Sequence, residues 1–467
     1  MIGKLLGLIL ARLVSPLTSF LIIVLVARIW GQAILGQYNT VWVWLIIFQL
    51  ISLFGISEYI AKEVGADRTR GAKYLTHGLL LVLVFSLISA VTMTAGALLF
   101  KYPEKVKYGI MTASLTLPFT ACILICQSIF TAFQKIKYIA VAGILENLLF
   151  LLLGSAVILR GYGLINLIWS LVLARFLASV LNLFMAHRYI TPLHFQIDWE
   201  FFWRLLPPVA VFGLTGVAFH IFMRIDVVML SKMRDMVTVG LYSSASKLME
   251  ICLMLPLTFY FLNLPIAAEG YKNFRKSVHQ KIEAHIEQFF ILVFFVFVFG
   301  IFFPETILGI IYGKPFVQAA MVLRLLMVAF LIQSAEITLE MSCQAAGYHK
   351  VVLRIAIVRA GTNVVLNFVF IPVWGALGAA FATLFSISLS FAMFQYFVKR
   401  TLGHFQWIRM AIKPALLCLS ILFLLFLLAD RLNTLLLALM FLLGYAFSLF
   451  ALNGFSFKRT TTPLSER

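Results

Sequence analysis

Six basic residues lie inside long apolar segments of this chain, where a charge is costly. A Lys or Arg at the centre of a membrane-spanning helix costs about 2.5 to 3.5 kcal/mol on insertion scales, so each such residue is a candidate for function. The guanidinium of arginine is also a planar fork that can bind two phosphate oxygens at once. An arginine of this kind that lines a cavity could therefore bind an anionic group such as phosphate. The six basic residues are Arg12, Arg175, Arg224, Lys247, Arg324 and Arg359.

Polar residues accompany several of these charges at helical spacing. A helix puts positions i, i+3, i+4 and i+7 on one face, so residues at this spacing form a stripe. Such a stripe cannot face lipid and must face other helices or a hydrated cavity. The stripes are Arg12, Ser15 and Ser19; Gly213, Gly216, His220 and Arg224; Gln333, Glu336, Glu340 and Gln344; and Arg359, Thr362, Asn363 and Asn367.

Arg12 and Arg359 are the best candidates to line such a cavity. Neither has an Asp or Glu three or four residues away that could neutralise it from its own helix. For Arg175 and Arg324, a structural role is as compatible with the sequence as a role in a cavity. Arg224 could equally reach the membrane surface or pair with a carboxylate of another helix.

The acidic residues of the spans suggest two further roles. Glu336 and Glu340 lie one helical turn apart, and their mutual repulsion and burial favour a proton on at least one of them. We therefore predict ion coupling at Glu336, Glu340 and Asp226. The alternative is that neighbouring arginines neutralise these carboxylates. Lys247 and Glu250, at i and i+3, favour a local ion pair.

The composition excludes a water-soluble protein. Hydrophobic residues make up 63% of the chain and charged residues 12%, against roughly 45 to 50% and about 25% in soluble domains. Apolar stretches of ~18 residues or more recur along the whole chain, and each can cross ~30 Å of hydrocarbon. Because these stretches are continuous rather than alternating, they favour helices over barrel strands. We predict an all-α integral membrane protein of about 14 transmembrane helices, near residues 5–29, 39–60, 76–100, 109–133, 139–159, 163–186, 206–230, 239–266, 288–311, 319–346, 351–371, 375–398, 408–429 and 433–453.

The basic residues outside these spans predict the orientation. The termini and even-numbered loops hold 22 Lys and Arg, and the odd-numbered loops hold 9. Cytoplasmic segments carry the excess of basic residues. We therefore expect both termini and the polar loop 267–287 in the cytoplasm, and we assign the net charge of +19 to membrane topology rather than to a nucleic-acid partner.

An internal repeat predicts two lobes. Gly36-Gln37-Tyr38 and Gly240-Leu241-Tyr242 each open the second span of a half, and AFQKIKYIAVAGILENLLF at 132–150 resembles AAGYHKVVLRIAIVRAGTNVVLNF at 345–368. An offset of six spans relates the halves by an axis along the membrane normal. We expect an N-terminal lobe at 1–190, a C-terminal lobe at 191–402, and two extra helices with a tail at 403–467.

Four stretches carry a family resemblance: ARIWGQAILGQYNTVW (27–42), RIDVVMLSKMRDMVTVGLYSSASKLME (224–250), FFPETILGIIYGKPFVQAA (302–320) and IPVWGALGAAFATLFS (371–386). In order and spacing they resemble the polysaccharide transporter branch of the multidrug, oligosaccharidyl-lipid and polysaccharide exporter superfamily, the Wzx-type flippases. The resemblance implies two six-helix lobes around a central cavity and the transfer of a polyprenyl-diphosphate-linked oligosaccharide, such as an O-antigen or exopolysaccharide repeat unit, to the periplasmic leaflet of a bacterial inner membrane.

Under this reading, Arg12, Arg359, Arg324 and Arg224 would hold the diphosphate. A proton or sodium gradient is the expected energy source, with no cofactor and no metal, and the expected partners are the lipid-linked glycan, membrane lipid and other glycan-assembly proteins. Two alternatives remain open. A multidrug exporter of the same fold would usually carry a carboxylate in its first helices, where this chain has Arg12, and a membrane glycan polymerase or ligase would usually carry a larger outer loop.

Overall fold

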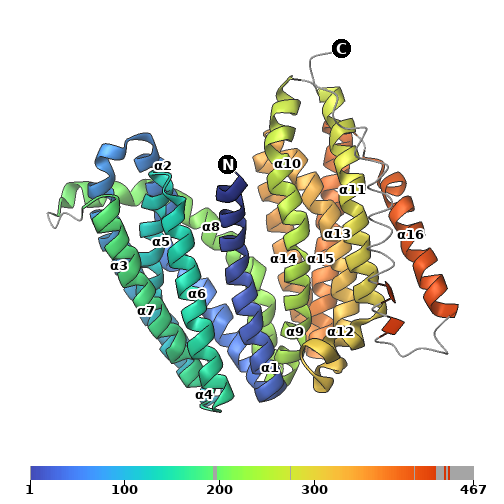
Figure 1. The fold of residues 1–467 in the computed structure, drawn as a ribbon, viewed down its shortest axis with the longest axis horizontal. Helices are drawn as coiled ribbons and strands as arrows, with labels where there is room; N and C mark the ends of the chain where they lie inside the picture. Colours follow the sequence, from blue (N-terminus) through green and yellow to red (C-terminus); the bar gives the residue numbers. More distant parts are fainter. Residues whose placement is uncertain are drawn as a thin grey trace. The chain divides into compact units, whose positions relative to one another are not determined.

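The computed structural model describes residues 2–192, 197–273, 275–403, 405–427, 436–437 and 440–441, and this part contains helices and no strands. The prediction of an all-α protein is confirmed (Figure 1). Contacts divide the chain into two compact units, residues 1–243 with 363–379 and residues 244–362 with 380–467. The division into lobes after residues 190 and 402 stays a prediction.

The first unit is a bundle in which α3, α5, α7 and α6 lie side by side in that order, and α1 packs against α6 and α8 (Figure 1). Its core includes Leu75 and Leu81 of α3 and Ile125, Ile129 and Phe130 of α5, all almost fully buried. The helices of this unit are α1 (Ile2–Leu53), α2 (Ile56–Ala66), α3 (Gly71–Leu99), α4 (Glu104–Ser114), α5 (Thr116–Ala132), α6 (Ile136–Leu159), α7 (Leu164–Tyr189) and α8 (Trp199–Met233), with a 3-10 turn at Arg68–Arg70.

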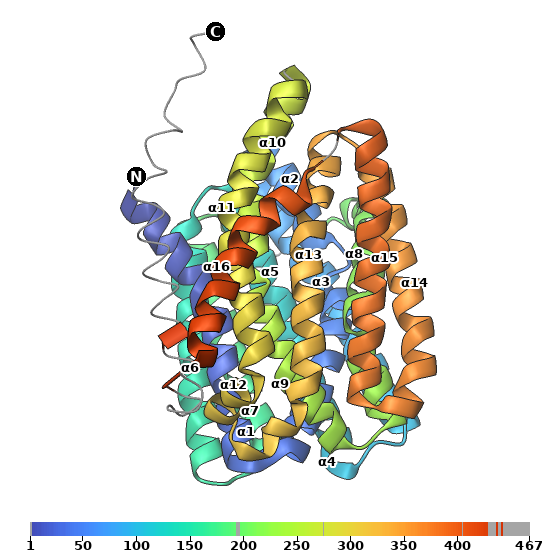
Figure 2. The ribbon, with the colours of Figure 1, turned by 90° about the vertical axis from the view of Figure 1, so that its right-hand side faces the viewer.

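In the second unit, α11 packs against α10, α13 and α16 (Figure 2). Phe441, from the predicted last span, stacks on Phe295 and Phe299 of α11. The helices that build this unit, or contribute residues to it, are α9 (Met236–Cys252), α10 (Met254–Asn273), α11 (Arg275–Phe302), α12 (Pro304–Ile311), α13 (Ala320–Ala345), α14 (His349–Trp374), α15 (Ala376–Thr401) and α16 (Trp407–Leu427), with a 3-10 turn at Lys314–Ala319.

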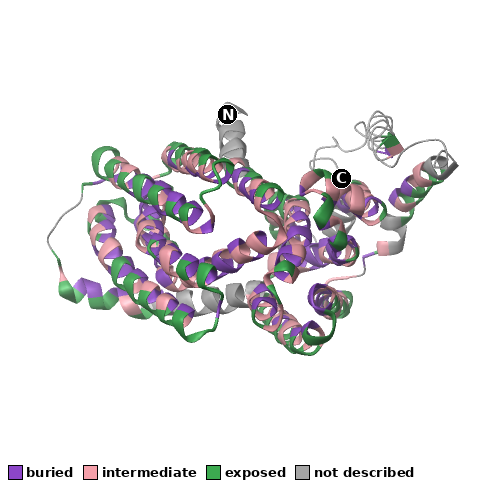
Figure 3. Ribbon diagram, turned by 90° about the horizontal axis from the view of Figure 1, so that it is seen from below, coloured by how far each residue is buried: buried purple, intermediate pink, exposed green. Residues whose placement is uncertain are grey.

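Many helices have faces made of exposed residues (Figure 3), and many of these residues are large and apolar. Val91 of α3, Leu152 of α6 and Phe184 of α7 are 70%, 69% and 56% exposed. Soluble monomers rarely expose extended apolar surface of this kind. These faces suit contact with lipid, and the chain is a multi-pass membrane protein.

Ten helical segments of the described part are long and apolar enough to cross a membrane. The prediction of about 14 spans exceeds this number for two reasons. The first two predicted spans count as one segment because both lie in α1, which is kinked at Gly31, and the predicted spans 206–230, 408–429 and 433–453 are not among the ten. Helices α8 and α16 cover the first two of these three, and most of the last lies outside the described residues. The exact number of spans stays a prediction.

Two glycines set the limits of the first two spans. Gly31, at φ 81° and ψ −174°, interrupts α1 at a single residue, so the short connection expected after residue 29 is a break inside one helix. Gly55, at φ 76°, separates α1 from α2, because this left-handed conformation ends a helix at little cost only for glycine. The predicted span 39–60 is therefore too long: it ends at Leu53, and α2 is a separate amphipathic helix.

The polar stretch 267–287 is not the loop that its composition suggests. Helix α10 continues to Asn273 and α11 begins at Arg275. The stretch is rich in Lys, Arg, Glu and Gln, which are good helix formers, and it contains no Pro. Its polarity therefore marks helix that extends beyond the apolar spans rather than irregular chain.

The two copies of the repeated glycine motif pack against each other within the first unit. A Cβ atom on Gly36 of α1 would lie 1.9 Å from the Met236 carbonyl oxygen, and one on Gly240 of α9 would lie 2.0 Å from the Gln32 carbonyl oxygen. Only glycine permits backbones to approach this closely. The motif therefore marks a helix crossing.

Candidate functional site

The second unit contains a buried ion pair between two of the predicted site residues. Arg359 of α14 lies with Nη1 3.4 Å and 3.3 Å from the two carboxylate oxygens of Glu336 of α13. The hydroxyl of Ser390, from α15, also interacts with Glu336. The Glu336 side chain is 3% exposed and the Arg359 side chain 18%. Glu336 is therefore enclosed by its partners, whereas Arg359 retains some access.

This pair brings together two helices whose contact the sequence did not predict. The helix that carries Arg359 offers it no carboxylate, as its spacing indicates, but a neighbouring helix does. Only Nη1 of Arg359 is engaged; Nε and Nη2 form no hydrogen bond with any described residue. The guanidinium can therefore still offer two donors to an anion.

A separate set of hydrogen bonds lies one turn further along α13. The amide of Gln344 donates to Glu340 Oε1 at 3.0 Å, and the hydroxyl of Tyr260 of α10 donates to Gln344 Oε1 at 2.7 Å. Glu340 also interacts electrostatically with Glu336 and Arg359. Three residues of the stripe predicted on this helix therefore contact polar side chains, Glu336 one from α14 and Gln344 one from α10, with Glu340 bonded to Gln344. The coupling roles of Glu336 and Glu340 stay predictions.

Arg324 lies at a helix end, away from this pair along α13. It is the fifth residue of α13, where its Nη2 donates to Glu305 Oε1 at 2.7 Å and its Nε donates to the Ile301 carbonyl oxygen at 3.2 Å. These bonds tie α13 to the junction of α11 and α12. Arg324 thus has a structural role, and its predicted contact with the substrate stays a prediction.

Of the other predicted residues, Asp226 and Lys247 have described contacts, and Arg12 and Arg224 do not have described side chains. Asp226 of α8 accepts a hydrogen bond from the hydroxyl of buried Tyr242 of α9, within the first unit. The local ion pair between Lys247 and Glu250 is confirmed, at 3.1 Å. The side chains of Arg12 and Arg224 lie outside the described residues.

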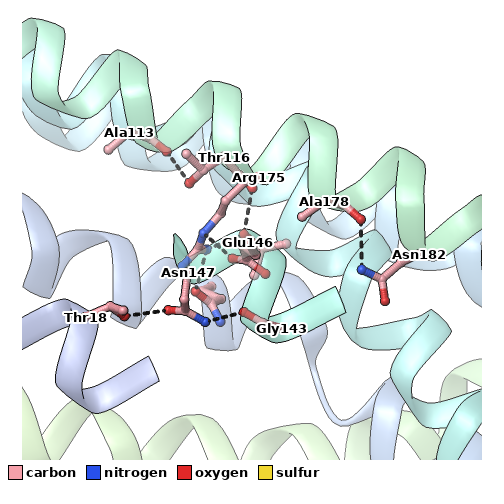
Figure 4. A network of polar contacts seen from close by, with 11 residues as sticks. Thr18, Ala113, Thr116, Gly143, Glu146, Asn147, Arg175, Ala178 and Asn182 are labelled. Atoms are coloured by element: carbon pink, nitrogen blue, oxygen red, sulfur yellow. Dashed lines mark hydrogen bonds and ion pairs between the residues drawn. The ribbon is translucent and has the colours of Figure 1, made fainter. Parts of the chain in front are cut away.

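A second polar centre lies in the first unit (Figure 4). Arg175 of α7 donates from Nη1 to Gln49 Oε1 of α1 at 3.3 Å and to the hydroxyl of Thr120 of α5. Glu146 of α6 lies with a carboxylate oxygen 3.6 Å from Arg175 Nε. Four helices of this unit therefore meet at one arginine.

Arg175 was among the candidates from the sequence, and Glu146 was not. Glu146 is the only charged residue of the predicted span 139–159, and the rule that marks intramembrane arginines as costly applies equally to carboxylates. That signal was sufficient to find it. Gln49 and Thr120, by contrast, carry no signal in the sequence, because neutral polar residues are common in such helices.

Comparisons of the sequence with known proteins find a family and relatives that are named for polysaccharide or glycan biosynthesis. The sequence model of a family described as polysaccharide biosynthesis protein matches residues 4–269. A protein of Staphylococcus aureus named capsular polysaccharide biosynthesis protein CapF is 21% identical over 406 residues, 84% of this chain and 97% of that protein. A protein of Haloferax volcanii named as a probable low-salt glycan biosynthesis flippase, Agl15, is 26% identical over 162 residues; this match spans only 34% of either protein.

Solved structures show which fold the chain has. A lipid II flippase, MurJ, in an inward closed conformation superposes with a TM-score of 0.76 at 17% identity, over 96% of this chain and 99% of that one. An inward-facing multidrug resistance transporter of the MATE family superposes with a TM-score of 0.67 at 17% identity, over 84% and 98%. Identities this low establish the transporter fold and nothing finer. The family match covers more than half of the sequence, and the chain belongs to the polysaccharide biosynthesis protein family.

Proposed function

We propose that this protein is a flippase that moves a polyprenyl-diphosphate-linked oligosaccharide from the cytoplasmic to the periplasmic leaflet by alternating access. The observation that carries the proposal is the partly open guanidinium of Arg359 inside a span. An arginine fork suits a diphosphate, and desolvation strengthens the contact. Family membership and the names of the relatives, one a glycan biosynthesis flippase and one a lipid II flippase, support the same function.

The finer features follow from the sequence and are part of the proposal. The substrate is an O-antigen or exopolysaccharide repeat unit, the location is a bacterial inner membrane with both termini in the cytoplasm, and the driving force is a proton or sodium gradient. Arg12, Arg224 and Arg324 are further candidates, predicted from the sequence, for contact with the diphosphate, and other glycan-assembly proteins supply and consume the glycan. The protein transfers the molecule without chemical change and is not an enzyme.

A reconstituted system tests this proposal. Purified protein in lipid vesicles is given a lipid-linked oligosaccharide confined to one leaflet, and a membrane-impermeant lectin measures how much reaches the other. We expect transfer of the intact molecule, faster than in protein-free vesicles. Elongation or transfer of the glycan onto an acceptor would indicate a polymerase or ligase, and transport of cationic drugs without movement of the glycan would indicate a multidrug exporter; either result refutes the proposal.

Arg354 provides a matched control. It lies on the same helix as Arg359, is exposed, and has no hydrogen bond or ion pair with any described residue. Arg354→Ala therefore removes one arginine from α14 without touching the buried pair. We expect this variant to transfer the glycan at the rate of the unmodified protein, and a large loss would mean that general basic charge, rather than Arg359, accounts for transport.

A further inference from the structure

Two buried Glu–Arg pairs among the described residues differ in how many contacts the carboxylate receives. In the second unit the carboxylate of Glu336 receives two contacts from Arg359 and one from Ser390, and its side chain is 3% exposed. In the first unit the side chain of Glu146 is 20% exposed, and its carboxylate receives no hydrogen bond from any described residue. The closest atom of its partner, Arg175 Nε, lies 3.6 Å away, which is beyond a hydrogen bond.

Arg175 does not depend on Glu146 for its hydrogen bonds. Its Nη1 is held by Gln49 and Thr120, which are both neutral, and its Nε has no hydrogen-bond partner among the described residues. If Glu146 became neutral, Arg175 would keep the hydrogen bonds it has now and lose only an electrostatic attraction. Neutralising Glu336 would instead disturb contacts to two other side chains. Of the two carboxylates, Glu146 is the one whose charge can change with little rearrangement.

Few titratable groups act on Glu146. It lies on α6, which packs against α1, α5 and α7. Among the described residues of these helices, the charged group facing it is Arg175, and Tyr38 of α1, which is buried, interacts electrostatically with Arg175. The remaining contacts of Arg175 on α1 and α5, Gln49 and Thr120, carry no charge. Among the described residues, the positive charge that opposes protonation of Glu146 is therefore that of Arg175, at 3.6 Å.

We propose that Glu146 is a proton-binding site of the transport cycle. This proposal rests on the proposed function, because a secondary transporter needs a group that takes up an ion on one side of the membrane and releases it on the other. The step adds one proton from water to the carboxylate, which becomes a neutral carboxylic acid, and removes the ion pair that links α6 to α7. Release of the proton restores that link.

Infrared spectroscopy tests the site without requiring transport. Purified protein in lipid vesicles is titrated, and the carbonyl stretch of a protonated carboxylic acid, which a carboxylate lacks, is recorded against pH. We expect the band to grow on acidification and to be smaller in Glu146→Gln, where an amide of the same shape replaces the acid, so that the difference between the two titrations reports Glu146. Glu146→Asp, which keeps a carboxyl group, should retain a band at a shifted position.

The matched control is the double variant Glu336→Gln with Glu340→Gln, which removes the carboxylates predicted from the sequence. We expect it to keep the band. If the titration of Glu146→Gln instead matches that of the unmodified protein, or the double variant shows the loss expected of Glu146→Gln, the proposal is overturned, and the second outcome assigns the proton to Glu336 or Glu340.

Transport separates this proposal from the proposed function. An imposed pH gradient should accelerate glycan transfer in the unmodified protein and leave the rate of Glu146→Gln unchanged. If the band behaves as expected but no glycan moves, the flippase assignment fails while the proton site stands. If Glu146→Gln responds to the gradient as the unmodified protein does, the proton site fails while the flippase assignment stands.

Discussion

Replacing Arg359 by alanine should have two separate effects, and the structure allows them to be distinguished. The substitution removes the proposed ligand of the diphosphate, and it also leaves Glu336, whose side chain is 3% exposed, without its counter-charge. Breaking a buried pair in this way costs about 3 to 5 kcal/mol. Protonation of Glu336 limits the cost, because neutralising a glutamate at pH 7 costs about 4 kcal/mol relative to its reference pKa. We therefore expect Arg359→Ala to lose about 3 to 4 kcal/mol of stability at pH 7.

The double variant Arg359→Ala with Glu336→Gln removes the stranded charge. A glutamine at position 336 can still accept a hydrogen bond from Ser390, so we expect most of the stability to return, measured as the Tm of the purified protein. Transport should not return, because no guanidinium remains at the site. Glu336→Gln alone, with Arg359 present, is the reference for transport. A double variant that is stable and transfers glycan as fast as Glu336→Gln would refute the role of Arg359 in holding the diphosphate.

Three further outcomes follow from other parts of the molecule. Gly36→Ala should destabilise the protein by about 1 to 3 kcal/mol by overpacking the helix crossing. Gly361→Ala, on a helix with open space around the new Cβ, should not destabilise it. Tm is measured for both variants, and equal Tm values would contradict the close crossing. The hydrogen bond from Lys73 holds the pKa of Asp198 below its usual value, so this bond stabilises the folded protein above about pH 4 and ceases to do so as the pH falls through the folded-state pKa. The difference in Tm between the unmodified protein and Asp198→Asn should therefore narrow on acidification. A difference that does not change with pH would argue against the bond. Lys276→Cys should react with a membrane-impermeant thiol reagent only from the cytoplasmic side, and labelling from outside intact cells would reverse the predicted topology.

How far the sequence predicted this structure depends on whether a contact lies within one helix or between two. Lys247 and Glu250 are three residues apart, and helical periodicity alone predicted their ion pair, which the structure contains at 3.1 Å. Arg359 and Glu336 are 23 residues apart on different helices. Periodicity correctly put each of them on a polar stripe but could not indicate that the two stripes meet. Partners across helices depend on packing, which a single sequence does not encode locally.

The same limit applies to the spans. Hydropathy located the apolar cores because the bilayer requires about 20 apolar residues in a row. It could not locate the ends, because Gly31 and Gly55 act through backbone conformation rather than polarity. In the stretch 267–287, polarity was mistaken for a loop because hydropathy reports the solvent around a residue and not its backbone conformation. Composition therefore predicted the type of fold, and local backbone chemistry decided the boundaries.

The arrangement of the two Glu–Arg pairs has a consequence for coupling. Glu146, in the first unit, presents a carboxylate that accepts no hydrogen bond from a described residue, and Arg359, in the second, presents a guanidinium whose Nε and Nη2 bond to no described residue. If the proton binds to the former and the diphosphate to the latter, the two do not compete for one group. Coupling must then act through a change between conformations that each ligand favours differently, because a ligand shifts such an equilibrium only by its difference in affinity. It follows that the affinity for a soluble diphosphate should depend on pH in the unmodified protein. In Glu146→Gln the affinity should lose this dependence while binding itself persists, which direct competition at a shared site would not allow.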